Sequence, residues 1–272
     1  MTVKTLEYRF DSQAPASRAH GSSAALRLLV PVVLVVAWQL CASLGWLDDF
    51  VLPSPWHILL AYQELWHTGE LQAALPVSLA RAGLGLAIGG GLGLVLGVIA
   101  GLSAHAERLY DAPLQMVRTI PFIALVPLFV VWFGIGELAK VLLIVGAAIF
   151  PVYLNAYHGI RGIDKKLLEL GNSFAMSRAE QVRLIVLPLA MPSILVGWRY
   201  AAGSALLGLV AAEQINSSAG LGYILNNANQ FQRTDIIIAG ILIYALLGVL
   251  VDIIMRQLER VLLTWRPRHD QP

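Results

Sequence analysis

Charged residues are scarce in this chain: Asp, Glu, Lys and Arg make up 13% of its 272 residues, whereas apolar residues make up 57%. Soluble domains carry about 25% charged residues and about 45–50% apolar ones. The low net charge of +2 and the high apolar content also exclude a disordered chain. We therefore interpret the chain as an integral membrane protein.

Cysteine is nearly absent, because Cys41 is the only one, and this excludes a disulfide framework and a multi-cysteine zinc site. The six histidines form no ligand cluster, so we expect no metal site. The phosphate-binding patterns G-x-x-x-x-G-K-[ST] and G-x-G-x-x-G are absent as well. Basic residues are spread between apolar runs, which argues against a nucleic-acid partner. We expect no catalytic residue and no cofactor in this chain.

Long uncharged runs predict six membrane-spanning helices, since roughly 20 apolar residues cross the hydrocarbon core. The predicted spans are 26–47, 82–104, 119–136, 141–160, 193–213 and 236–256. They predict an all-α membrane protein, a six-helix polytopic bundle over 26–260, with polar tails over 1–25 and 261–272. The first run is longer than the apolar region of a signal peptide and no A-x-A-like site follows it, so we expect a retained anchor.

The distribution of Lys and Arg predicts the orientation of the chain. With the N-terminus in the cytoplasm, all 19 of these residues except Arg81, Lys140 and Arg233 fall on the inner side. An excess of Lys and Arg marks the cytoplasmic side of membrane proteins. Both termini are therefore expected in the cytoplasm.

Glycine recurs at every fourth position of the second span, at Gly85, Gly89, Gly93, Gly97 and Gly101. Small residues at this spacing allow two helix backbones to approach closely. We expect this stripe to pack inside one subunit, and a sliding surface or a contact between subunits is the alternative.

The fifth predicted span carries two charges, Arg199 and Glu213. Their 14-residue separation corresponds to roughly 21 Å of helix, which is less than the hydrocarbon core of about 30 Å. Charges at membrane depth usually face the bundle interior or a cavity. For Arg199, snorkelling to the interface is the simpler interpretation. For Glu213, lining of an outward vestibule and a structural role are equally open.

Together with a kinked third span, these features give a set of candidate residues for a translocation path. The set consists of Arg118, Pro121, Arg199, Glu213, Gln214 and Asn216. Near the end of the sixth span, Asp252 and Arg256 have the i, i+4 spacing of a local ion pair.

The stretch 161–192 between the fourth and fifth spans is dense in charge and has a helical pattern. Ser177 and Glu180 have the spacing of a capping box, which predicts that a second short helix begins there. We interpret this helix–turn–helix as a docking element for a soluble partner.

The residues of this loop resemble a known family. Glu169-Leu170-Gly171, Ala175 and Ile185-Val186-Leu187-Pro188 are similar to the E-A-A-x3-G-x9-I-x-L-P loop of ABC importer permeases. Gly171 replaces the second alanine of that pattern, and Ala175 replaces the glycine at its turn. Segments across the chain resemble the aliphatic sulfonate branch of the sulfonate, taurine and nitrate group. These segments include Leu52-Pro53-Ser54-Pro55, Trp132-Phe133-Gly134, Ala212-Glu213-Gln214-Ile215 and Arg233-Thr234-Asp235.

The resemblance implies a type I ABC importer transmembrane domain in the bacterial inner membrane, and a transport subunit rather than an enzyme. It implies two cytoplasmic ATPase subunits, a second permease copy forming a homodimer, a periplasmic substrate-binding protein and contact with membrane lipid. It also implies that the ATPase acts through the cytoplasmic loop. The implied coupling residues are Glu169, Leu170, Gly171, Ala175, Ser177, Ile185, Leu187 and Pro188.

Other functions stay open at this point. The same machinery could carry taurine, nitrate or a heteroaromatic precursor. An ion-coupled secondary transporter would be expected to show inverted repeats and broken helices, which the sequence does not display. An intramembrane hydrolase is suggested only by Gly171-Asn172-Ser173, half of a G-x-S-x-G pattern, with no histidine or aspartate placed to serve it.

Overall fold

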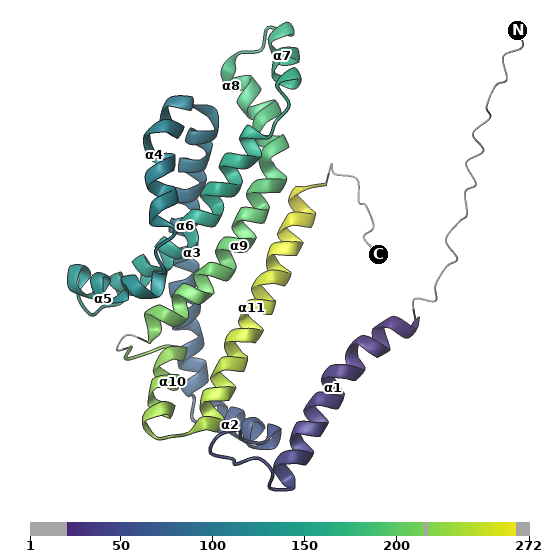
Figure 1. The fold of residues 1–272 in the computed structure, drawn as a ribbon, viewed down its shortest axis with the longest axis vertical. Coiled ribbons are helices and arrows are strands. Elements are labelled where there is room, and N and C mark those ends of the chain that lie inside the picture. The colour runs from purple at the N-terminus through teal and green to yellow at the C-terminus, as the bar shows by residue number, and fades with distance from the viewer. Residues whose placement is uncertain (1–20, 215–216, 265–272) are drawn as a thin grey trace, which may run out of the picture. The chain divides into compact units, whose positions relative to one another are not determined.

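The computed structural model describes residues 21–214 and 217–264, and every regular element within them is a helix (Figure 1). The all-α fold class is therefore confirmed. Most of the tails predicted over 1–25 and 261–272 lies outside the described residues, and so does Asn216.

The described residues up to Trp56 belong to one unit, which contains helix α1 (Gly21–Ser43). This helix corresponds to the predicted first span, 26–47, but ends earlier, and Gly45 just beyond it takes a positive φ of 74°. After this turn the backbone N–H of Trp56 donates a hydrogen bond to Gln39 Oε1 at 3.0 Å. The chain is thereby fixed where it leaves α1.

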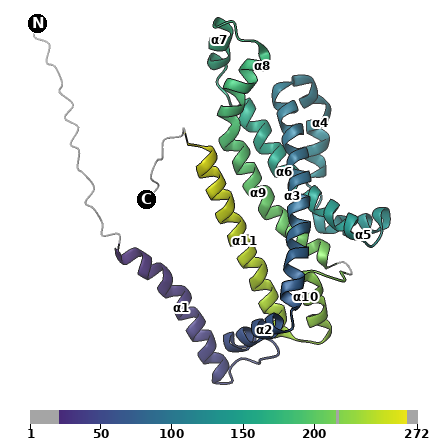
Figure 2. The ribbon, with the colours of Figure 1, turned by 180° about the vertical axis from the view of Figure 1, so that it is seen from behind.

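The second unit begins at residue 57, within helix α2, and contains the remaining described helices. They are α2 (Pro55–His67), α3 (Glu70–Leu102), α4 (Ala104–Val117), α5 (Phe122–Phe133), α6 (Glu137–Arg161), α7 (Lys165–Ser173), α8 (Arg178–Gln181), the π-helical segment η1 (Val182–Val186), α9 (Leu187–Glu213), α10 (Leu221–Gln230) and α11 (Thr234–Leu262). Helices α3, α6 and α9 lie side by side, and α11 packs along α9 (Figures 1 and 2). Helices α7 and α8 lie beyond one end of α9, here called the loop end, and α10 lies at the other, here called the α10 end.

The glycine stripe of α3 packs directly against α6. A Cβ atom at Gly97 would lie 2.6 Å from the backbone oxygen of Tyr153, and one at Gly101 would lie 2.8 Å from Cβ of Ile160. The other three glycines of the stripe face α6 in the same way. The stripe therefore serves packing inside one subunit, as expected.

The contact between α6 and α9 is made of small apolar residues. Ala148, Val152, Ala201 and Leu209 have no exposed surface, and Ala205 has 2%. Because lipid tails are as apolar as the side chains, close van der Waals packing rather than the hydrophobic effect holds such helices together. Helices α3, α6 and α9 thus form a tightly packed frame for the polar groups at the α10 end.

Four helical stretches are long and apolar enough to cross a membrane: Glu70–Leu102, Glu137–Arg161, Arg178–Glu213 and Thr234–Leu262. They correspond to the second, fourth, fifth and sixth predicted spans. Apolar stretches over Leu29–Ser43 and Ile123–Phe133, in the regions of the first and third predicted spans, are shorter.

In the region of the third predicted span, 119–136, the structure has a helix with shorter bounds, α5 (Phe122–Phe133). Helix α5 has 12 residues and extends about 18 Å, which is less than a hydrocarbon core of about 30 Å. Pro121 lies at its N-cap in an extended conformation, and Gly134 ends the helix with a φ of 75°. Pro121 therefore begins a helix instead of kinking one, and Pro127 is the proline inside it.

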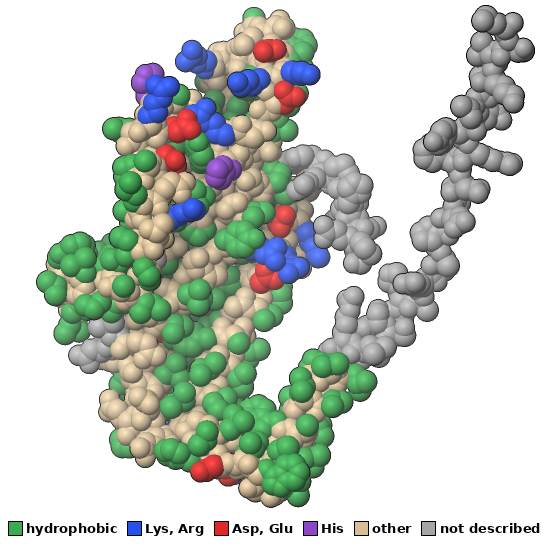
Figure 3. Space-filling model, viewed as in Figure 1, with side chains coloured by type: hydrophobic (Ala, Val, Ile, Leu, Met, Phe, Trp, Pro, Cys, Tyr) green, Lys and Arg blue, Asp and Glu red, His purple; other side chains and the backbone are tan. Residues whose placement is uncertain are grey.

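Helix α4 is additional to the six predicted helices. Ser103 caps it by accepting a hydrogen bond from the backbone N–H of Ala106, and Glu107 in its first turn pairs with Arg161 and Tyr157 of α6. Charged side chains gather around α4, α7 and α8 and beside the part of α11 nearest to them, and few appear along the rest of the long helices on this face (Figure 3).

Candidate functional site

The carboxylate of Glu213, the last residue of α9, is completely buried at the α10 end. From α3, Ser78 Oγ and Arg81 Nη1 donate hydrogen bonds to its Oε1 at 2.6 and 2.7 Å. The Tyr244 hydroxyl of α11 and the backbone N–H of Gly222 in α10 donate to its Oε2 at 2.8 and 2.9 Å. Because a buried charge is costly unless it is paired and hydrogen-bonded, this carboxylate anchors four helices to one another.

Arg81 connects Glu213 to a second carboxylate. Its Nε and Nη2 atoms donate to Glu137 of α6 at 2.6 and 2.5 Å, and its Nη1 atom also donates to the backbone oxygen of Ala219 at 2.8 Å. Lys140 Nζ lies 3.4 Å from Glu137 Oε1. We call Arg81, Glu137, Lys140 and Glu213 the charge cluster, in which two acidic side chains balance two basic ones.

Two glycines allow the chain before α10 to reach the charge cluster. Gly220 has a φ of 103°, and a Cβ atom there would lie 2.6 Å from Arg81 Nη1. A Cβ atom at Gly222 would overlap the side chain of Glu213. A side chain at either position would therefore push α10 away from the carboxylate.

The structure places the two charges of the fifth span in different surroundings. Glu213 has no exposed surface, so in this structure it does not line an open vestibule. Arg199 lies on α9, 14 residues before Glu213, and its side chain is 39% exposed. Its Nε donates a hydrogen bond to Asp252 Oδ1 of α11 at 2.7 Å. Arg256 Nε lies 2.7 Å from the other oxygen of Asp252, which confirms the predicted ion pair.

Two hollows lie next to the charge cluster. The first, of about 690 Å³, lies between α5, α6 and α9 and is mainly apolar; Pro121, Val126, Ala147, Ser204, Leu207, Val210 and Gln214 are among its lining residues. The second, of about 460 Å³, is lined by Val210, Gln214, Leu225, Asn226, Asn229, Ile237, Ile241 and Tyr244. Val210 and Gln214 belong to the walls of both. Neither set of described lining residues contains a charged side chain.

Of the predicted path residues, the structure brings Pro121 and Gln214 together in the first hollow. Arg118 is exposed at the C-cap of α4 and lines neither hollow. Asn216 lies outside the described residues.

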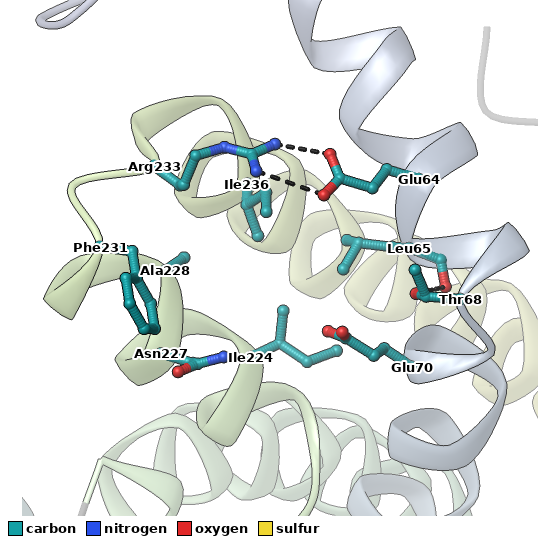
Figure 4. A pocket seen from close by; sticks show the side chains of 10 residues that line it. All are labelled: Glu64, Leu65, Thr68, Glu70, Ile224, Asn227, Ala228, Phe231, Arg233 and Ile236. Atoms are coloured by element: carbon teal, nitrogen blue, oxygen red, sulfur yellow. Dashed lines mark hydrogen bonds and ion pairs between the residues drawn. The ribbon is translucent and has the colours of Figure 1, made fainter.

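A smaller pocket of about 150 Å³ lies between α2, α10 and the start of α11 (Figure 4). Arg233 closes one side of it by donating to both carboxylate oxygens of Glu64, at 3.2 and 2.6 Å. Hydrogen bonds to Asp235 and Glu64 raise the pKa of Arg233 above its ordinary value, so the guanidinium stays charged. The carboxylate of Glu70 and the amide of Asn227 line the same pocket.

The loop between α6 and α9 has the predicted helix–turn–helix form. Asp164 caps α7 by accepting a hydrogen bond from Lys166 N–H, and Ser177 and Glu180 form the predicted capping box of α8. Ala175, at the turn between the helices, has a φ of 53°. The turn thus has the left-handed geometry that glycine usually supplies. Gly171 is buried against Gln181 and Ile185, where a Cβ atom would be 3.0 Å from Ile185 Cδ1.

The same loop presents an apolar hollow of about 350 Å³, lined by Leu167, Leu170, Leu184, Ile185, Pro188 and Leu189. Leu170 and Leu184 are 53% and 62% exposed. Glu169, beside Leu170, is exposed, and its carboxylate has no hydrogen-bond or ion-pair partner among the described residues. Exposed apolar surface rimmed by polar groups is typical of an interaction site.

The sequence prediction missed the side-chain partners of Glu213, namely Ser78, Arg81 and Tyr244, and the second partner of Arg81, Glu137. The charge distribution predicts Arg81 and Lys140 on the outer side of the membrane, although each adjoins a predicted span. Arg81 has no acidic residue within one turn of it on α3 and so needs a partner on another helix, whereas Lys140 has Glu137 on its own helix. That signal could have pointed to the acidic residues of α6 and α9.

Comparison with known proteins identifies the family. The sequence profile of the family described as "Binding-protein-dependent transport system inner membrane component" matches residues 93–263. The chain is 45% identical to the aliphatic sulfonates transport permease protein SsuC of Bacillus subtilis over 89% of this chain and 88% of that one. It is 45% identical to the Escherichia coli protein of the same name over 88% and 91% of the two chains. The taurine transport system permease protein TauC of Escherichia coli is 34% identical over 86% of each chain.

Solved structures of lower identity share the fold. An inward-facing form of the MetNI methionine ABC transporter matches with a TM-score of 0.57, 18% identity, and coverage of 78% of this chain and 98% of that one. An amino acid ABC transporter solved with histidines matches with a TM-score of 0.58 at 18% identity, over 74% and 96% of the two chains.

These matches exclude the ion-coupled secondary transporter and the intramembrane hydrolase, and they confirm a membrane-embedded transport subunit rather than an enzyme. Such a subunit works with an ATPase and a substrate-binding protein. The chain belongs to the family of binding-protein-dependent transport system inner membrane components, the permease subunits of ABC importers.

Proposed function

We propose that this chain is one of two identical permease subunits that carry aliphatic sulfonates across the bacterial inner membrane. The observation that supports this substrate class is 45% identity, over 88–89% of the chain, to permeases named for aliphatic sulfonates in two bacteria. The permease named for taurine is 34% identical.

The loop from Glu169 to Pro188 is the proposed contact with the ATPase. Its exposed leucines give an apolar surface that a cleft in the ATPase can bury, and the unpaired carboxylate of Glu169 can meet a basic residue at the rim. The turn at Ala175 and the capping box at Ser177 hold the two short helices in a fixed geometry. The loop can therefore transmit movement of the ATPase to α9, since η1 continues into that helix.

The first hollow supports a role for α5 and α9 in the translocation path. It is open and mainly apolar, with Pro121 and Gln214 in its wall. A second permease copy placed against α5 and α9 would cover it and enclose a path between the two subunits. In this arrangement the loop end and both termini face the cytoplasm, and the α10 end faces the binding protein.

Uptake by the reconstituted complex tests the proposal. The chain is co-expressed with its ATPase and binding-protein partners, placed in proteoliposomes, and supplied with radiolabelled ethanesulfonate outside and ATP inside. We expect uptake that requires both ATP and the binding protein, and unlabelled alkanesulfonates without an amino group should compete better than taurine or nitrate. ATP-dependent uptake of taurine, nitrate or a heteroaromatic compound, but not of ethanesulfonate, would reject the proposed substrate class. The conclusion that the complex is an ATP-driven importer would still stand.

A further inference from the structure

Three residues with carboxamide side chains line the second hollow. Gln214 comes from the end of α9, and Asn226 and Asn229 come from one side of α10, which they share because of their i, i+3 spacing. We call these three residues the carboxamide cluster. The rest of the wall consists of Val210, Leu225, Ile237, Ile241 and Tyr244. The hollow therefore combines a polar group of neutral donors with an apolar wall.

The N–H donors of this cluster are largely available to a ligand. Asn226 Nδ2 makes one long hydrogen bond, of 3.4 Å, to the backbone oxygen of Gln214. The side chains of Gln214 and Asn229 are exposed and make no hydrogen bond to other described residues. Each carboxamide carries two N–H donors and one acceptor. An oxyanion in the hollow could accept several hydrogen bonds at once.

The nearby full charges do not contribute to this hollow. Arg81 and Lys140 are neutralised by Glu137 and Glu213 within the charge cluster. The Tyr244 hydroxyl donates to Glu213, so this wall residue is held by the cluster. An anion in the hollow would thus meet N–H dipoles but no uncompensated cation among the described lining residues.

A carboxamide N–H can donate a hydrogen bond to an anion but, unlike Arg or Lys, brings no opposite full charge, so the attraction is weaker than in an ion pair. Transport requires a site that is favourable enough to enter and weak enough to leave. An alkanesulfonate has three oxygen acceptors on its head and an apolar tail, which match the carboxamides and the aliphatic wall. The shared residues Val210 and Gln214 place the first hollow directly beyond this one.

We propose that Gln214, Asn226 and Asn229 form a weak, uncharged binding site for the sulfonate head group, from which the substrate passes into the first hollow. This proposal rests on the proposed function, because it takes an alkanesulfonate as the transported ligand. Glu213 is the positioning residue of the site, since its buried carboxylate fixes the end of α9 from which Gln214 extends.

Replacement of a carboxamide by the isosteric carboxylate tests the site, since it removes N–H donors and adds a charge that repels the sulfonate. In proteoliposomes containing the whole complex, Asn229→Asp and Gln214→Glu should each lower ATP-driven uptake of ethanesulfonate at least tenfold. The matched control is Asn227→Asp, which makes the same change on the same helix but lines the pocket of Figure 4 instead. Its uptake should stay within twofold of the unsubstituted complex.

Two further measurements separate loss of the site from loss of the complex. The ATPase should co-purify with each variant in the usual amount, and the concentration of loaded binding protein that gives half-maximal ATPase activity should change less than twofold. Asn229→Gln, which keeps the donors, should retain most of the uptake. Asn229 is exposed, so its substitution does not disturb packing. If the Gln214→Glu complex fails to assemble, the uptake of Asn229→Asp alone tests the carboxamide site.

The outcomes distinguish the site from the function. If Asn229→Asp transports ethanesulfonate as well as Asn227→Asp does, the carboxamide site is wrong, while the sulfonate importer stands. If the unsubstituted complex shows no ATP-dependent uptake of any alkanesulfonate, the proposed function fails, and the site fails with it.

Discussion

Arg81 Nη1 lies 2.7 Å from Glu213 Oε1, although the two residues are on different helices and neither side chain is more than 4% exposed. This ion pair fixes the end of α9 to α3. Through Gly222 and Tyr244 the same carboxylate also holds α10 and α11. The α10 end of the bundle therefore depends on one buried carboxylate with four donors.

Glu213→Ala is expected to reduce the stability and the folded yield of the complex, and not its transport alone. Removal of one partner from a buried pair costs about 3–5 kcal/mol, because the other charge is left uncompensated. Thermal unfolding of the detergent-solubilised complex measures the loss. Glu64→Ala is the control: it breaks an ion pair in which Glu64 is 48% exposed, and it should cost no more than about 1 kcal/mol. Equal stability of the two variants would contradict the anchoring role of Glu213.

The stripe of α3 gives a second prediction. Gly97→Ala should destabilise the protein by about 1–3 kcal/mol, because its Cβ would press on the backbone of α6 and overpacking of a tight contact carries this cost. Gly91→Ala on the same helix meets no atom within 4 Å and should be neutral or stabilising by about 0.5–1 kcal/mol. The two thermal midpoints, compared under one condition, test whether the stripe is a packing surface. A similarly small change of the thermal midpoint in both variants would show that the stripe is not a packing surface.

At the turn of the loop, Ala175→Gly should stabilise α7 and α8 by about 1–2 kcal/mol, since a left-handed conformation strains an L-residue by that amount. Transport should be retained. Ala179→Gly in α8 serves as the opposite control, because glycine inside a helix costs about 1 kcal/mol. Hydrogen exchange of the amides around the turn reports both effects, and faster exchange in Ala175→Gly would contradict the strain.

Local patterns predicted the features that depend on neighbouring residues. The capping box of Ser177 and Glu180 and the ion pair of Asp252 and Arg256 each involve residues within one helical turn, and both were confirmed. The packing of the glycine stripe was also predictable, since the i, i+4 repeat already places these residues on one helix face.

The features that join distant helices could not be read from such patterns. Arg81 and Glu213 meet only because α3 and α9 pack on α6, and no local spacing encodes that contact. The length of α5 was missed for a different reason. Its sequence is apolar enough for a span, but the positive φ of Gly134 and the extended Pro121 break the helix at both ends.

The most direct test of the central claim concerns the loop at Glu169, through which ATP hydrolysis is proposed to drive transport. Uptake of ethanesulfonate and ATPase activity are measured together in proteoliposomes that carry Glu169→Arg, with Glu70→Arg at the α10 end as a charge-reversal control for assembly. Like-charge juxtaposition at an interface costs several kcal/mol, so Glu169→Arg should abolish most uptake and weaken co-purification of the ATPase, whereas Glu70→Arg should leave co-purification unchanged. Unchanged uptake and unchanged co-purification in Glu169→Arg would contradict coupling through this loop.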